Sequence, residues 1–98
     1  MKKYLILYDI SCNKTRNFFV KKLKRYGFYR LQKSVFLGYT NKEKLKKLEV
    51  TIEKTFKKST TDSYIILPVS EYEIKNIKYW GEQINMDLYL GRINVVFI

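Results

Sequence analysis

The chain has 98 residues, of which 46% are hydrophobic, so it is long enough for one small globular domain with a single core. Its 20 lysines and arginines against nine acidic residues give a net charge of +11, which indicates a polyanionic partner such as nucleic acid. With no histidine and only one cysteine, Cys12, the sequence excludes an imidazole base, an intrachain disulfide and a structural zinc cluster.

A genome rich in lysine codons is the simpler explanation of this charge, but it does not explain why glutamate is so much scarcer. No apolar run approaches the roughly 20 residues of a membrane span. Asp9 interrupts the short apolar stretch behind Met1, and no cleavage site of a signal peptide follows. We therefore expect a single cytoplasmic domain over residues 1–98 that does not enter a membrane.

The first predicted element is a strand over residues 3–10. Five consecutive apolar or aromatic residues, from Tyr4 to Tyr8, are typical of a strand buried on both faces. Asp9 follows at the end of this strand, where a carboxylate is held firmly and still meets solvent. Asn13 or Ser11 is expected to cap a helix that runs to about Tyr26, and Gly27 is expected to end it.

Residues 28–39 are rich in aromatic and β-branched side chains. We interpret them as two short antiparallel strands, 28–32 and 34–39, joined near Lys33; a single bent strand is the alternative. Thr40 and Asn41 then cap a second helix that ends near Lys57. Its buried side is predicted to consist of Leu45, Leu48, Ile52 and Phe56.

The remaining chain predicts a strand over 63–69 with Pro68 near its end, a short helical turn over 71–76, and a strand over 77–80 stopped by Gly81. Residues 93–98 are predicted to form an extra C-terminal strand. This order of elements indicates an α+β, ferredoxin-like βαββαβ fold, with an antiparallel sheet, both helices on one face and the first strand in the centre.

Three stretches together match the pattern of a known family: the end of the first strand, the start of the first helix, and the run behind it. They read Tyr8-Asp9-Ile10-Ser11, Arg16, and Gly27-x-x-Arg30-x-Gln32-x-Ser34-Val35-Phe36. In these residues the chain resembles CRISPR-associated protein 2, the small nuclease-like partner of the CRISPR integrase. The resemblance covers almost the whole length, and the tail after Gly81 matches least well.

The resemblance implies a homodimer of ferredoxin-like subunits with metal-dependent endonuclease activity on RNA or double-stranded DNA. It also implies that the dimer bridges two integrase dimers when new spacers are captured. Asp9 falls on the metal-binding position of the family, and Tyr8, Arg16, Arg30 and Phe36 fall on neighbouring functional positions. Some relatives carry a second acid directly after the first, where this chain has Ile10.

Without histidine or paired carboxylates, hydrolysis of a phosphodiester needs water activated by a metal ion. Mg²⁺ is the expected ion, with Mn²⁺ as an alternative, because hard cations prefer oxygen ligands. One aspartate holds such an ion weakly, so we expect Asp9 from both subunits of an isologous dimer to share it. The structural alternative for Asp9 is the cap of a turn or helix.

The other candidate residues also have structural alternatives. Arg16 and Arg30 are suited to binding phosphate, although isolated arginines are usually surface residues. Tyr8 and Phe36 are aromatic residues that belong to a core more often than to a catalytic site. Cys12, near a helix start, is a candidate for a thiol of lowered pKa, and without a second cysteine it receives little weight.

The function we expect is spacer acquisition in CRISPR antiviral defence, with metal-dependent cleavage of RNA or duplex DNA. The first alternative is a non-catalytic scaffold that binds duplex DNA and bridges the integrase. The second is a toxin-like ribonuclease of the virulence-associated type. We further expect residues 93–98 to pair with the edge of the partner's sheet, because four consecutive apolar residues make a poor free tail.

Overall fold

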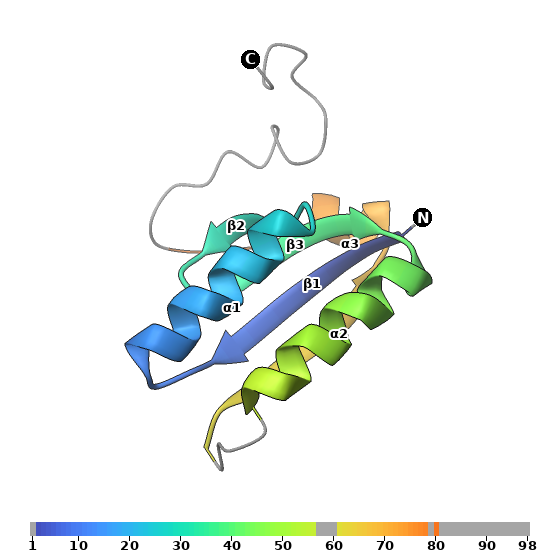
Figure 1. Ribbon diagram of the computed structural model, residues 1–98. Helices are drawn as coiled ribbons and strands as arrows, with labels where there is room; N and C mark the ends of the chain where they lie inside the picture. Colours follow the sequence, from blue (N-terminus) through green and yellow to red (C-terminus); the bar gives the residue numbers. More distant parts are fainter. Residues whose placement is uncertain (1, 57–60, 79, 81–98) are drawn as a thin grey trace, which may run out of the picture.

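The computed structural model describes residues 2–56, 61–78 and 80 of the chain. Four strands form one antiparallel sheet in the order β2-β3-β1-β4, with β1 in the centre as predicted (Figure 1). This arrangement confirms the ferredoxin-like fold. In chain order the elements are β1 (Lys2–Asp9), α1 (Asn13–Arg25), β2 (Tyr29–Gln32), β3 (Val35–Thr40), α2 (Lys42–Phe56), β4 (Ser63–Val69) and α3 (Glu71–Lys75).

The two faces of the sheet differ in what covers them. Helices α1 and α2 lie side by side over one face, which we call the covered face, while α3 lies behind the sheet (Figure 1). The face behind we call the open face. Successive side chains of a strand point to opposite faces, so Tyr4, Ile6 and Tyr8 of β1 belong to the covered face. Leu5 belongs to the open face, where it packs against the cluster that contains Ile74 of α3.

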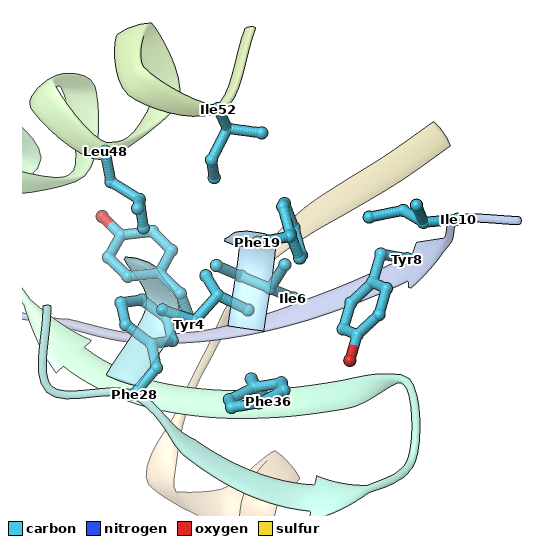
Figure 2. Packing of buried hydrophobic residues seen from close by; sticks show 10 residues of the cluster. Tyr4, Ile6, Tyr8, Ile10, Phe19, Phe28, Phe36, Leu48 and Ile52 are labelled. Carbon is cyan, nitrogen blue, oxygen red and sulfur yellow. The ribbon is translucent and has the colours of Figure 1, made fainter. Parts of the chain in front are cut away.

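The main core lies between the sheet and the two long helices (Figure 2). Phe36 of β3 and Ile6 of β1 are 0% exposed at its centre. The ring of Tyr8 meets Phe19 of α1 edge-on, with centroids 4.7 Å apart. The buried members of this core are Tyr4, Ile6, Tyr8, Ile10, Phe19, Leu23, Phe28, Phe36, Leu48 and Ile52.

Helix α1 ends as its sequence predicts. Gly27 has a φ of +86°, a conformation that side-chain-bearing residues rarely adopt. Its N–H donates to the Lys24 carbonyl at 3.1 Å, and the N–H of Phe28 donates to the Leu23 carbonyl at 3.0 Å. These two bonds form a Schellman motif, and they turn Phe28 into the core.

Phe28 then packs on the covered face directly against Gly38 of β3. A Cβ atom at Gly38 would lie 2.4 Å from a ring carbon of Phe28, which is too close for any side chain. Glycine at this position therefore makes room for the buried ring. The hairpin of β2 and β3 confirms the two predicted strands, and the register shifts between Arg30 and Gln32.

The second helix and the fourth strand also agree with the sequence. Asn41 Oδ1 accepts the backbone N–H of Lys44 at 2.8 Å, which confirms a cap at the start of α2. Leu48 and Ile52 are buried, and Leu45 and Phe56 pack against them. Strand β4 lies at an edge of the sheet, where Pro68 is tolerated.

Two predictions of local structure were wrong. The N-cap of α1 is Cys12, without a side-chain cap hydrogen bond, instead of Ser11 or Asn13. Residues 77, 78 and 80 are not part of a strand. The N–H of Ile77 donates to the Ile74 carbonyl at 3.2 Å, so the chain leaves α3 in a turn and places Ile77 against the open face.

The predicted strand over residues 93–98 and its pairing with a partner lie outside the described residues. Among the residues that the structure describes, no helix has the length and apolar character to cross a membrane.

Candidate functional site at the end of the first strand

Asp9 is the last residue of β1, and its side chain is exposed at one end of the sheet. Its backbone is aligned with Ser63 of β4, whereas pairing with β3 stops two residues earlier, at Leu7. The alternation of β1 places Asp9 on the same face as Leu5, which is the open face. The central strand thus holds a carboxylate rigidly where solvent, a metal ion or a second molecule can reach it.

The loop behind Asp9 is held in place from two sides. Asp62, just before β4, accepts hydrogen bonds from Ser11 through one oxygen, from the backbone N–H at 3.1 Å and from the hydroxyl at 3.2 Å. The Arg16 guanidinium donates from Nη1 to the Ile10 carbonyl at 3.0 Å, and from Nη2 to Asn13 Oδ1. These bonds explain why neither Ser11 nor Asn13 caps α1.

Asp62 is a residue that the sequence analysis missed. The residue it binds, Ser11, lies 51 positions away in the chain, and no motif joins the two. The only local signal is an aspartate directly before a strand, which is common in loops. The contact becomes visible only when β1 and β4 are paired.

Tyr8 lies on the other face from Asp9, within the main core. It is 6% exposed, and its hydroxyl donates to the Lys33 carbonyl at 2.9 Å. Its backbone N–H donates to the Ser34 carbonyl at 3.1 Å, so Tyr8 fixes the turn between β2 and β3. This agrees with the core role that was the structural alternative for Tyr8.

Phe36 and Arg30 belong to the same side as Tyr8. Phe36 is fully buried, and its ring centroid lies 6.1 Å from that of Tyr8. The Arg30 guanidinium carbon lies 5.3 Å from the Phe36 ring centroid, within the range of a cation–π contact. The exposed Arg30 side chain thus covers the outer edge of the core.

The five predicted site residues therefore form two groups. Asp9 comes directly before the loop that ends β1, and Arg16 of α1 donates to the Ile10 carbonyl of that loop. Tyr8, Phe36 and Arg30 lie together on the covered face. The backbone of β1 connects the groups, because Tyr8 and Asp9 are consecutive residues. Their catalytic roles stay predictions.

Cys12 is exposed at the start of α1. The polar groups of nearby Thr15, first its backbone N–H and then its side chain, favour the thiolate and lower the pKa of the Cys12 thiol below its usual value of 9.0. The nearby negative charge of Asp62 opposes this effect.

A hard divalent cation takes oxygen ligands, and Asp9 offers it one carboxylate. Within residues 2–56, 61–78 and 80, no three histidine, cysteine, aspartate or glutamate residues gather into a possible metal site. A carboxylate at the exposed end of a sheet does suit an ion shared between subunits, because a second copy can bring its own Asp9. Among the described residues, Asp9 is thus one carboxylate ligand that the same residue of a second copy could complement.

Comparison with known proteins identifies the relatives of this chain. The family model of CRISPR associated protein Cas2 matches residues 1–77. A protein of Francisella tularensis subsp. novicida (strain U112), named CRISPR-associated endoribonuclease Cas2 1, is 42% identical over 76 residues, which are 76% of this chain and 74% of that protein. A protein of the same name from Methanospirillum hungatei JF-1 is 32% identical over 66 residues, covering 67% and 70% of the two chains.

Three solved structures share the fold of this chain. The hypothetical protein TT1823 from Thermus thermophilus superimposes with a TM-score of 0.65 at 30% identity, over 70% of this chain and 82% of that one. A chain of a partial Cas6-RT-Cas1–Cas2 complex gives 0.67 at 29% identity, with coverages of 81% and 84%. Streptococcus pyogenes Cas2 at pH 6.5 shares the fold, with a TM-score of 0.71 at 19% identity and coverages of 81% and 99%.

Proposed function

The chain belongs to the CRISPR associated protein Cas2 family, and from this premise we propose that it is an endoribonuclease that acts in CRISPR adaptation, the capture of new spacers. Two relatives, 42% and 32% identical, carry the name CRISPR-associated endoribonuclease. Another, 29% identical, is part of a complex that contains Cas1. We propose that this chain likewise assembles with the CRISPR integrase, in the cytoplasm.

The observation that carries the proposed activity is the position of Asp9. Its carboxylate is exposed at the end of a central strand, and the bonds of Asp62 and Arg16 hold the loop behind it. A Mg²⁺ or Mn²⁺ ion, when bound, would supply activated water and neutralise charge on the phosphate. Asp9 would hold the ion, and Arg16 would keep the loop in place through the Ile10 carbonyl.

We propose that two copies of the chain complete this site across a two-fold axis. The open face supports such a dimer, because Ile65 is 57% exposed and Leu67 is 45% exposed there, beside Asp9 on the same face. Two bare carboxylates close together repel each other, so a shared cation would join them. Dimer formation and metal binding would then depend on each other.

The decisive experiment is a cleavage assay of RNA and duplex DNA with highly purified wild type and Asp9→Asn. We expect cleavage that requires Mg²⁺ or Mn²⁺, disappears in EDTA, and falls about a hundredfold or more in Asp9→Asn, since the ion contributes several kcal/mol to the transition state. Glu53→Gln, which removes an exposed carboxylate from α2, is the matched control and should cleave like wild type. Full activity in EDTA or in Asp9→Asn would contradict the proposal.

The second candidate function is a non-catalytic scaffold that binds duplex DNA. It is favoured by the net charge of +11, because binding to phosphates through lysine and arginine needs neither a metal ion nor a catalytic carboxylate. In that case wild type and Asp9→Asn would bind duplex DNA equally, and neither would cleave above background. The same preparations thus distinguish the two functions.

Residues 93–98 are predicted to pair with the edge of the partner's sheet, and deleting residues 94–98 tests this pairing. If this segment pairs with the partner, the shortened chain should be monomeric or aggregate and should lose metal-dependent cleavage. Sedimentation equilibrium measures the state of association. A shortened chain that stays a stable dimer would show that the dimer does not depend on this segment.

A further inference from the structure

The outward side of α1 carries basic side chains around one exposed aromatic ring. Positions three and four residues apart on a helix share a side, and this spacing relates the members of the group. We call the group the α1 basic surface, and it consists of Lys14, Phe18, Lys21, Lys22 and Arg25. The whole helix contains six lysines and arginines and not one acidic residue.

This charge pattern is not that of an ordinary solvated helix, as α2 shows. Helix α2 lies beside α1 on the same face and has five lysines, but Glu43, Glu49 and Glu53 lie among them. Opposite charges three or four residues apart on a helix attract each other, and they lower its net charge. On α1 every charge repels the next, so a bound polyanion would relieve the repulsion.

Phe18 is the second unusual feature of this surface. It is 41% exposed, whereas the adjacent Phe19 is 1% exposed in the core. The ammonium of Lys22 lies 5.2 Å from the centroid of the Phe18 ring. The ring is thus anchored by a cation–π contact and still presents much of its area to solvent, directly among groups that attract phosphate.

We propose that the α1 basic surface is a non-catalytic binding site for single-stranded nucleic acid. Lys14, Lys21 and Arg25 contact successive phosphates, and an unpaired base stacks on Phe18. A duplex keeps its bases stacked inside, so it would meet the lysines but leave the ring unused. An acidic protein partner would also meet the lysines, but it would not need an aromatic platform.

This site differs from the one at Asp9. It lies on the outer side of the helix layer, whereas Asp9 lies on the open face behind the sheet. The inference rests on the proposed function only in taking nucleic acid as the ligand, and it requires no cleavage. We therefore test it with Asp9→Asn as the parent protein, so that the result does not depend on whether Asp9 is catalytic.

The test compares short fluorescent single-stranded oligonucleotides with the blunt duplex of the same sequence, by anisotropy titration of the full chain. Phe18→Leu keeps an apolar side chain and removes the ring. We expect it to weaken single-strand binding about tenfold, in the range measured for one stacked base. Duplex binding should change less than about twofold, and Phe18→Tyr should bind like the parent.

Val50→Ala is the matched control, because Val50 is an exposed apolar residue of α2 in the same helix layer, 48% exposed. It should leave both affinities unchanged. Lys21→Gln and Arg25→Gln should each weaken binding and lower the slope of log affinity against log salt by about 0.7, the value for one phosphate contact on a single strand.

Three results would overturn the inference. Single-strand affinity of Phe18→Leu within about twofold of the parent would remove the stacking role. Equal losses of affinity for the single strand and the duplex would show that the surface binds the phosphate backbone of a duplex instead. Salt slopes unchanged by Lys21→Gln and Arg25→Gln would show that nucleic acid does not contact α1, and would leave this surface to an acidic protein.

Discussion

The covered and open faces of the sheet differ in how far they bury the side chains of the central strand, β1. On the covered face Tyr4, Ile6 and Tyr8 are all buried beneath α1 and α2. On the open face Leu5 is only half-buried and Asp9 is exposed. An exposed carboxylate loses none of its hydration on folding and is open to solutes. The alternation of β1 therefore separates buried, structural side chains from the exposed side chain of Asp9.

Tyr8 and Asp9 show what this separation means for a motif. They are adjacent in the sequence and belong to the same family pattern, but the Tyr8 hydroxyl is bound to the Lys33 carbonyl inside the core. Adjacent residues of a strand cannot point to the same site. A matching motif can therefore mark one residue that acts and one that holds the first in place.

The sharpest test of the comparison uses two isoleucines of neighbouring strands, Ile6 on the covered face and Ile65 on the open face. Ile6 is 0% exposed and Ile65 is 57% exposed. Ile6→Ala should lower the free energy of unfolding by about 2–5 kcal/mol, because it leaves a cavity. Ile65→Ala should cost less than about 1 kcal/mol in the monomer. Urea unfolding measures both.

If a second copy covers the open face, the loss in Ile65→Ala should grow with protein concentration, since dimerisation adds stability by mass action. The loss in Ile6→Ala should be the same at every concentration. Equal losses in the two variants at low concentration would mean that the faces do not differ as described.

The next largest effect is expected at Gly38, on the covered face. Gly38→Ala places a methyl group against the buried Phe28 ring, which would lie 2.4 Å away if nothing moved. Overpacking of this kind should cost about 1–3 kcal/mol in unfolding free energy. Phe28→Leu should recover part of this loss when combined with Gly38→Ala, and strict additivity in that double-mutant cycle would contradict the close packing.

A smaller effect is expected from Tyr8→Phe, which removes one hydroxyl from the covered face. The Lys33 carbonyl loses its donor, so unfolding free energy should fall by about 0.5–1.5 kcal/mol. Cleavage by the same variant, measured at a temperature where it is folded, decides whether Tyr8 has the catalytic role that the family pattern implies. A variant as stable as wild type would refute the structural role.

The smallest effect concerns α3, which covers part of the open face. Ser70 and Glu73 form a capping box, and the Ser70 backbone N–H, 2.8 Å from the Glu73 carboxylate, lowers the pKa of Glu73 below its usual value of 4.5. A lowered pKa in the folded state means that Glu73 stabilises α3 above that usual value. This stabilisation is lost as the pH falls through the lowered pKa.

Glu73→Gln should therefore be less stable than wild type near neutral pH, and the difference should shrink in acid. Unfolding curves of the two proteins from neutral pH to well below 4.5 test this. A difference that stays constant over this range would show that the Glu73 charge plays no part.

Much of the fold followed from local patterns. The predicted strand over 63–69 has the observed bounds of β4, and the apolar spacing of α2 identified its buried side. Gly27 ends α1 because this cap needs a residue with a left-handed backbone conformation, which glycine adopts most readily. These features depend on residues within a few positions of one another, so the printed sequence contains all the information they need.

The wrong predictions concern residues whose contacts are with residues distant in the sequence. Ser11 was expected to cap α1, but it binds Asp62 instead, and that partner comes from another strand end. Ile77 has the apolar character of a strand residue, but its side chain packs on the sheet instead of joining it. In each case a contact with a residue distant in the sequence replaced the local role that the sequence pattern had predicted.

By itself the sequence determined the order of the elements, the central place of β1 and the exposure of Asp9, because alternation, caps and apolar spacing are local properties. Only the tertiary structure decided which predicted site residues lie together. Tyr8, Phe36 and Arg30 come from three strands and meet on the covered face, while Asp9 points away from them. Strand pairing set that division, because the spacing of residues along the chain does not show which strands are neighbours or which of their side chains meet.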